Sequence, residues 1–205
     1  KAFDLMGKFD IDQGVEDIGA ALNALRNLDA CTGKVGCIGF CLGGKLAYLT
    51  AARQNVDAAV SFYGVGIEGM LDESKNISCP VQMHFAALDQ YVPESAVAEI
   101  TNHFASRDNV EIYSYANVDH AFYNHARAEV YDRPASMMAH SRTIAVLHRV
   151  MGPHYNLEAL WDDHLKFEFA TRNTEDTLAT MVSQPYINHI PTMTGGTGFE
   201  ELGRF

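Results

Sequence analysis

Gly39-Phe40-Cys41-Leu42-Gly43-Gly44 is the stretch of this chain that decides its fold. The run 34–40 that leads into it is rich in β-branched residues and glycine, and the run 45–53 that leads out is compatible with a helix. This pattern predicts a strand, a sharp turn and a helix, with the thiol of Cys41 at the apex. Such a nucleophile elbow presents a reactive side chain, usually a serine, at the end of a strand.

Three further short apolar runs predict buried strands, at residues 58–63, 80–86 and 110–115. Helical periodicity predicts three helices around them, at about residues 15–28, 94–106 and 135–150. Short apolar strands that alternate with helices indicate an α/β fold, with a mostly parallel sheet covered by helices on both faces. A ligand site in such a fold is expected beyond the carboxyl ends of the strands.

The loops after the two later strands carry an acid and a histidine. Asp89 follows strand 80–86 and His120 follows strand 110–115, so the order is nucleophile, acid, histidine, as in α/β-hydrolases. We therefore expect Cys41, Asp89 and His120 to converge at one edge of the sheet. In these roles His120 accepts and returns the thiol proton, and Asp89 orients the imidazole. The backbone N–H of Leu42 is the expected oxyanion donor, because it follows the nucleophile.

Other interpretations of the same residues are less specific. A buried cysteine at a strand-to-helix turn is common in cores, and we expect Cys37 to pack there. The glycines at 36, 39, 43 and 44 do not fit the G-x-G-x-x-G spacing of a dinucleotide-binding turn. His120 and His125 are five residues apart, which is poor spacing for a shared metal site on a helix, so we predict no metal.

Composition limits the partners. The 205 residues carry a formal net charge of −11, which argues against nucleic acid and against an anionic membrane surface. No apolar run approaches the roughly 18 residues of a membrane helix. No export signal is recognised and the four cysteines form no C-x-x-C pair, so we expect reduced thiols and a cytoplasmic protein. The sequence carries no signal for an oligomeric state.

The motifs resemble those of the dienelactone hydrolase (carboxymethylenebutenolidase) family over about residues 10–150. The resemblance is carried by the elbow, by Leu88-Asp89-Gln90-Tyr91-Val92-Pro93 and by Asp119-His120-Ala121-Phe122. It implies a hydrolase of small-molecule lactones or esters, with a Cys41–Asp89–His120 triad, a covalent acyl-thiol intermediate and no redox or metal cofactor.

The resemblance also locates substrate-binding candidates. Family members that act on dienelactone carry an arginine four positions after the histidine, where this chain has Asn124. Arg127 lies nearby and is the candidate substitute. With Tyr63, which ends strand 58–63, these residues are the predicted substrate-binding residues.

The pattern breaks at residues 151–156, and we expect a domain boundary near residue 152. Beyond it, a helix is predicted at 157–170, a second helix begins at Asn173, residues 185–191 are extended and residues 195–198 form a turn. This part resembles the start of a nuclear-transport-factor-2-like (SnoaL-like, polyketide-cyclase-like) cone domain. Because few residues precede the elbow strand, we expect residues 1–151 to be an α/β-hydrolase domain without its N-terminal strands, and 152–205 to be the start of the cone domain.

Two alternatives stay open at this point. The chain is either an internal portion of a longer two-domain protein or a naturally short, degenerate hydrolase. Its function is either hydrolysis of an ester or lactone or, on the same scaffold, a non-catalytic binding or assembly role. Thioesterase or peptidase chemistry with the same triad is a further alternative.

Overall fold

A computed structural model describes residue 5, residues 7–153 and residues 156–204. The chain divides into two compact units, residues 1–153 and 154–205, and each is described by itself. Residues 154–155 of the predicted break lie outside the described residues.

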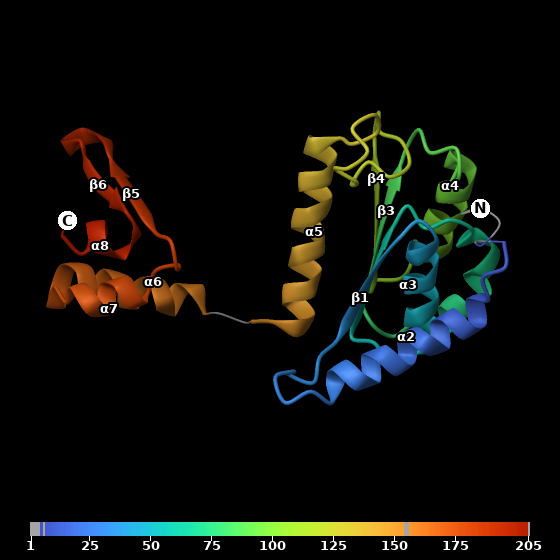
Figure 1. Cartoon of the computed structure of the whole chain (residues 1–205), viewed down its shortest axis with the longest axis horizontal. Helices are drawn as coiled ribbons and strands as arrows, with labels where there is room; N and C mark the ends of the chain where they lie inside the picture. The colour runs from blue at the N-terminus through green and yellow to red at the C-terminus, as the bar shows by residue number, and fades with distance from the viewer. Residues whose placement is uncertain (1–4, 6, 154–155, 205) are drawn as a thin grey trace. The chain divides into compact units, whose positions relative to one another are not determined.

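The first unit is built on a sheet of four parallel strands in the order β1-β2-β3-β4 (Figure 1). The strands are β1 (Gly36–Phe40), β2 (Ala58–Phe62), β3 (Val81–Ala86) and β4 (Val110–Tyr115). The helices are α2 (Ile11–Arg26), α3 (Leu42–Arg53), α4 (Glu94–Phe104) and α5 (Arg133–Met151), with a 3₁₀ helix η1 (Glu68–Asn76) after β2. The predicted α/β-hydrolase-type fold is confirmed for the parallel sheet and its covering helices.

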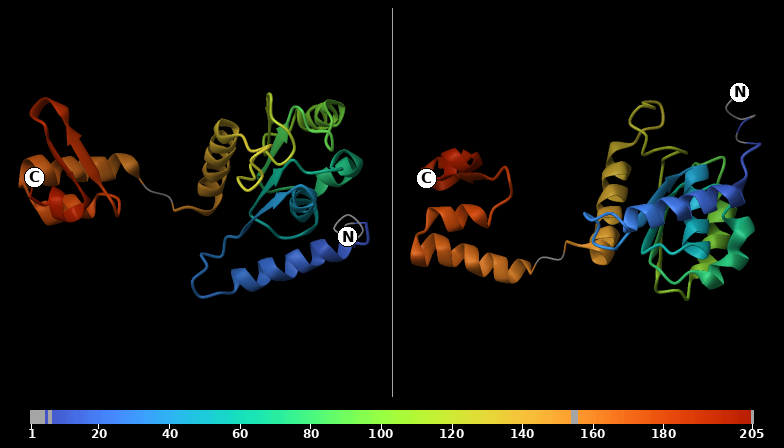
Figure 2. Two further views of the ribbon diagram at one scale, coloured as in Figure 1. Left: turned by 45° about the horizontal axis from the view of Figure 1, so that its top comes forward. Right: turned by 60° about the horizontal axis from the view of Figure 1, so that its bottom comes forward.

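Helices cover both faces of the sheet (Figure 2). On one face, Val15 of α2, Tyr48 of α3 and Ile100 of α4 share a core with Ala59 and Met83 of the sheet. On the other face, α5 packs over the remaining side chains, which include Val60, Phe62 and Tyr115. Every residue of β2 is therefore buried, which explains why this strand is an uninterrupted apolar run rather than an alternating one.

The ends of the first helix differ from the predicted range 15–28. Helix α2 begins at Ile11, because the side chain of Asp10 caps it by accepting the backbone N–H of Gln13 at 3.1 Å. The apolar periodicity on which the prediction rested begins one turn later, at Val15. The 3₁₀ helix η1 was not predicted, since its nine residues show no helical apolar stripe.

The second unit contains helices and a two-stranded antiparallel sheet. Its elements are α6 (Leu157–Leu165), the π-helical η2 (Lys166–Thr171), α7 (Thr174–Ala179), β5 (Tyr186–His189), the 3₁₀ turn η3 (Ile190–Thr192), β6 (Thr194–Thr197) and α8 (Gly198–Leu202). Helix α7 begins next to Asn173, as predicted, and Asn173 caps it, because its side chain accepts the backbone N–H of Asp176 at 3.2 Å.

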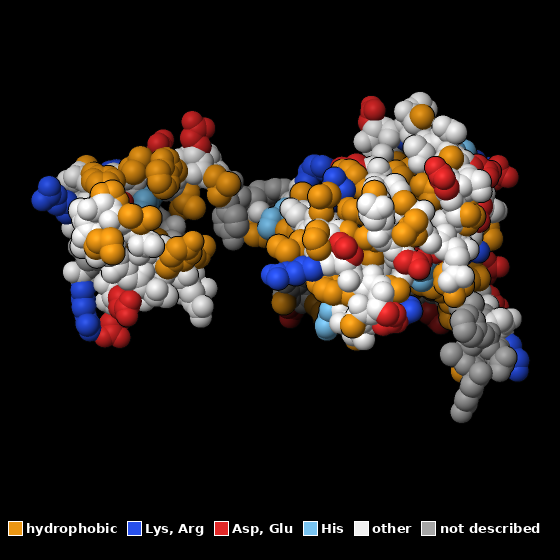
Figure 3. Space-filling model, turned by 90° about the horizontal axis from the view of Figure 1, so that it is seen from above, with side chains coloured by type: hydrophobic (Ala, Val, Ile, Leu, Met, Phe, Trp, Pro, Cys, Tyr) orange, Lys and Arg blue, Asp and Glu red, His pale blue; other side chains and the backbone are white. Residues whose placement is uncertain are grey.

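The prediction of a turn at residues 195–198 is wrong, since these residues largely form strand β6. Gly195 lies so close to β5 that a Cβ atom there would be 2.0 Å from the carbonyl oxygen of Ile187. The glycine thus permits strand pairing rather than a turn. Large apolar side chains such as Trp161 and Tyr186 are exposed on this unit, and apolar patches are visible on its surface in Figure 3. Its assignment to a cone domain stays a prediction.

Within the described ranges 7–153 and 156–204, no helix has the length and apolar character needed to cross a lipid bilayer.

Candidate active site

Cys41 stands at the sharp turn between β1 and α3. Its backbone has φ 56° and ψ −118°, a strained conformation for a residue with a side chain. The turn is held by the backbone N–H of Cys41, which donates to the carbonyl of Phe62 at 3.0 Å. It also depends on Gly39, where a Cβ atom would lie 1.8 Å from the carbonyl oxygen of Gly43. The local geometry is that of a nucleophile elbow.

Asp89 and His120 come together although they lie in different loops. Asp89 Oδ2 and His120 Nδ1 are 2.6 Å apart, and both residues are buried. The other carboxylate oxygen of Asp89 accepts the backbone N–H groups of Tyr91 at 2.8 Å and Val92 at 3.2 Å. Asp89 is therefore fixed by backbone donors on one side and is free to orient the imidazole with its other oxygen.

The thiol and the imidazole favour their charged forms. A hydrogen bond with His120 lowers the pKa of Cys41, and the backbone N–H of Leu42 adds to this effect, while burial opposes it. Burial alone would lower the pKa of His120, but hydrogen bonds with Asp89 and Cys41 outweigh it and raise the pKa to about 9. Both shifts favour a thiolate beside an imidazolium more than the same two groups would in isolation.

Two of the other cysteines have the opposite electrostatic environment. Burial raises the pKa of Cys37 to about 12 and also raises the pKa of Cys79. Both pack against the core, as predicted for Cys37. The activated thiol environment is therefore a property of the elbow rather than of cysteines in this chain generally.

A cavity of about 460 Å³ opens onto Cys41 and His120. Its wall also contains the three predicted substrate-binding residues, Tyr63, Asn124 and Arg127. The remaining lining residues are Phe40, Val65, Tyr91 and Ala121. The cavity thus brings all the predicted side chains, apart from Asp89 behind His120, to one surface.

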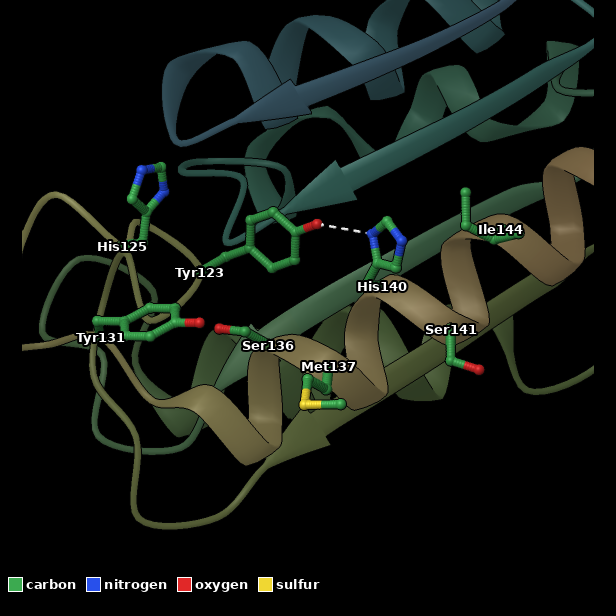
Figure 4. Close-up of a pocket in the computed structure, with 8 residues that line it drawn as sticks. All are labelled: Tyr123, His125, Tyr131, Ser136, Met137, His140, Ser141 and Ile144. Atoms are coloured by element: carbon green, nitrogen blue, oxygen red, sulfur yellow. Dashed lines mark hydrogen bonds between the residues drawn. The ribbon is translucent and has the colours of Figure 1, made fainter. Parts of the chain in front are cut away.

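Two larger cavities carry no cysteine. One of about 590 Å³ lies between the loop after β4 and helix α5, and Figure 4 shows Tyr123 in it, hydrogen-bonded to Nδ1 of His140 at 2.9 Å. The other, of about 700 Å³, lies within the second unit beside Trp161. Each of them has a hydroxyl beside a histidine, Tyr123 beside His140 and Thr180 beside His164. Neither has a cysteine at a strand-to-helix elbow, so the smaller cavity at Cys41 is the candidate active site.

Sequence reasoning missed Tyr91 as a site residue. It lies in the predicted acid loop, but nothing in the pattern indicates that its ring contacts His120. Phe40 and Val65 were missed for the same reason, because whether they line the cavity depends on the tertiary arrangement of the loops. Among the residues that the structure describes, no group of three or more His, Cys, Asp or Glu side chains is placed to hold a metal ion.

Comparisons with known proteins bear on the family and the fold. The sequence model of the dienelactone hydrolase family matches residues 1–151. A carboxymethylenebutenolidase of Pseudomonas putida is 37% identical over 122 residues, which are 60% of this chain and 52% of that protein. Carboxymethylenebutenolidase 1 of Cupriavidus pinatubonensis is 33% identical over 153 residues, which are 75% of this chain and 64% of that protein.

A solved structure gives the same result for the fold. A Klebsiella pneumoniae protein provisionally named a dienelactone hydrolase superposes with a TM-score of 0.61 and 26% identity, covering 68% of this chain and 62% of that chain. The chain spans about half the length of the Pseudomonas putida relative and somewhat more of the Cupriavidus one.

Proposed function

The chain belongs to the dienelactone hydrolase family over residues 1–151, and we propose that it hydrolyses esters or lactones of small molecules with Cys41 as nucleophile. The observation that carries the proposal is the single cavity where the thiol of Cys41 meets an imidazole that Asp89 orients. Family membership supports the reaction class, and the arrangement of these three side chains supports the residues that perform it.

In the first half of the reaction, the Cys41 thiolate attacks the carbonyl carbon and a C–S bond forms. The developing oxyanion is positioned for the backbone N–H of Leu42, which begins helix α3. When the tetrahedral intermediate collapses, the C–O bond to the alkoxide breaks and His120 donates its proton to that oxygen. The products are an acyl-thiol on Cys41 and a free hydroxyl, which stays tethered when the substrate is a lactone.

In the second half, His120 is neutral and acts as a general base. It removes a proton from water, whose oxygen attacks the acyl-thiol carbonyl. The C–S bond then breaks, which releases the carboxylic acid and restores the thiolate beside the imidazolium. Asp89 keeps the Nδ1 side of the ring occupied throughout, so that Nε2 faces the cavity.

The cavity wall supports a substrate that carries an anionic group. Arg127 contributes a guanidinium to the wall, and its Nε donates to Glu129 at 3.0 Å, which leaves further N–H groups of the same side chain as donors. Asn124 lies on the same wall and offers an amide. We propose that Arg127 and Asn124 hold a carboxylate of the substrate while Tyr63 contacts its carbon skeleton.

The test is turnover and trapping with the chain as it stands. The protein is incubated with dienelactone, 4-nitrophenyl acetate and a short acyl thioester, and intact mass spectrometry detects acylation. We expect turnover of the lactone or the oxygen ester, an acyl adduct on Cys41, and loss of both in Cys41→Ala. Cys31→Ala is the matched control and should keep both. Preferential turnover of the thioester would redirect the assignment to a thioesterase.

A complete lack of turnover and adduct with every substrate would overturn the proposed activity. A Cys41→Ala variant that keeps full turnover would leave the reaction class intact but remove Cys41 from it.

A further inference from the structure

Two tyrosine rings lie against the imidazole of His120, and they come from different loops. The ring centroid of Tyr63 is 4.8 Å from that of His120, with 59° between the planes. The ring centroid of Tyr91 is 5.0 Å from it, with 67° between the planes. These separations are those of direct aromatic contact. The general base of the site is therefore enclosed by aromatic groups as well as by its hydrogen-bonding partners.

Tyr91 contacts both members of the acid–base pair. Its backbone N–H donates to Asp89 at 2.8 Å, and its ring contacts His120. Its side chain is 52% exposed, so little of the core depends on it. One residue thus fixes the carboxylate with its backbone and the imidazole with its side chain.

Tyr63 is held in an unusual backbone conformation. Its φ is 39°, in the left-handed region that bulky residues rarely adopt, and the side chain is only 3% exposed. The ring packs against Phe122 at 5.7 Å as well as against His120. Backbone strain that the surrounding packing maintains is often found at functional sites. Here the strained residue places its ring on the general base.

We propose that Tyr63 and Tyr91 are positioning residues, whose rings hold the imidazole of His120 in place and stabilise its charged form. This role rests on the proposed hydrolysis through Cys41 and His120. The π-faces of tyrosine attract a cation at this range, so both rings favour the imidazolium over the neutral ring. They also restrict rotation of the imidazole about its Cβ–Cγ bond, which keeps the ring in the orientation set by the contact of Nδ1 with Asp89.

The other titratable and charged groups that face His120 act on the same equilibrium. Asp89 and Cys41 act on the His120 ring as hydrogen-bonding partners, and Asp119 accepts the backbone N–H of His120 at 2.6 Å. Arg127 lies on the wall of the same cavity and carries a positive charge. Because the substitutions at Tyr91 remove none of these four groups, a change in the pKa of His120 can be assigned to the missing ring.

The test uses Tyr91, since it is exposed and both substitutions leave its backbone N–H in place. Tyr91→Phe keeps the ring and Tyr91→Leu removes it. Tyr131→Leu is the control, at a tyrosine that is not among the rings on His120 and does not line the cavity at Cys41. The first measurement is the rate of Cys41 alkylation by iodoacetamide between acid and alkaline pH, which needs no hydrolysis. The alkaline limb of this profile reports loss of the His120 proton beside the thiolate, and we expect Tyr91→Leu to move that limb down by about half to one pH unit. Tyr91→Phe and Tyr131→Leu should match the wild type.

The second measurement is the steady-state hydrolysis of the substrate that the wild type turns over. A positioning role predicts a severalfold lower kcat for Tyr91→Leu with an unchanged KM. The proposal is overturned if the alkylation profile of Tyr91→Leu matches the wild type, or if Tyr91→Phe shifts as much as Tyr91→Leu. A higher KM with an unchanged kcat and profile would make Tyr91 a substrate contact instead.

Failure of the proposed function can be distinguished from failure of this inference. If the wild type hydrolyses nothing, the alkylation profiles still decide whether the rings act on His120. Thermal unfolding verifies that each variant is folded, and if Tyr91→Leu is not, Tyr91→Met provides the same comparison without an aromatic ring.

Discussion

Replacing His84 with glutamine should change how the stability of this protein depends on pH. His84 is fully buried between β3 and α5. Its Nε2 is 2.9 Å from Gln82 Oε1 and 3.2 Å from Thr143 Oγ1, and its Nδ1 is 2.9 Å from the hydroxyl of Tyr115. Because Gln82 Oε1 can only accept, Nε2 carries the hydrogen and Nδ1 is left to accept from Tyr115. These contacts fit a neutral ring.

Protonation of this ring is unfavourable in the folded protein. Burial, followed by the positive charge of Arg142, lowers the pKa of His84 from 6.5 to about 3, and Glu111 opposes this only in part. In the unfolded chain the same group takes up a proton near pH 6.5. Below that pH the unfolded state binds one proton more than the folded state, so stability is lost as the pH falls.

The magnitude follows from the difference between the two states. One pKa unit corresponds to about 1.4 kcal/mol, so His84 removes about 2 kcal/mol from the free energy of unfolding between pH 7 and pH 5. This loss of stability hardly depends on the pKa of His84 in the folded protein, as long as that pKa lies well below 5. It is a large fraction of the stability of a typical domain.

The assay is urea unfolding of the wild type and His84→Gln at pH 7 and at pH 5. The wild type should lose about 2 kcal/mol more than His84→Gln over this interval, whatever the two stabilities are at pH 7. Other titrating groups are common to both proteins and cancel in the comparison. His125→Gln, at an exposed histidine, should keep the slope of the wild type. Equal pH slopes for the wild type and His84→Gln would refute the reasoning.

Three further predictions concern the site and its support. His120→Gln removes the hydrogen bond that contributes most to lowering the pKa of Cys41. The rate of Cys41 alkylation by iodoacetamide at pH 7 should therefore fall by about tenfold or more and recover as the pH approaches 9. An unchanged rate would show that His120 does not activate the thiol. Gly39→Ala places a methyl group 1.8 Å from the carbonyl oxygen of Gly43 and should lower the free energy of unfolding, measured in urea, by about 3 kcal/mol. The added methyl group of Gly43→Ala meets no atom within 4 Å, so this control should keep the stability of the wild type. Equal stability of the two variants would contradict a tight elbow. Arg127→Gln should raise the KM for a carboxylate-bearing ester about tenfold and leave the KM for an uncharged ester unchanged; a similar effect on both substrates would argue against recognition of an anion.

The sequence by itself determined the order and type of most elements. The strands and helices were predicted from apolar runs and periodicities that extend over only a few residues. For this reason the position of β4 and the start of the helix after Asn173 were predicted correctly. The glycine-flanked Cys41 was recognisable for the same reason, because a strand, a tight turn and a helix follow one another along the chain. The family and the fold follow from these local signals, and the proposed triad depends on them.

Tertiary structure decided what depends on contacts between distant segments. The 2.6 Å contact between Asp89 and His120, the two rings on His120 and the buried state of His84 require loops and faces that are far apart in the sequence. Strand β6 was mistaken for a turn because glycine composition predicts turns locally, whereas the close approach of β5 is a nonlocal constraint. Burial, side-chain pKa values and strand pairing depend on contacts between segments that are distant in the sequence, and the local periodicity of the sequence does not encode those contacts.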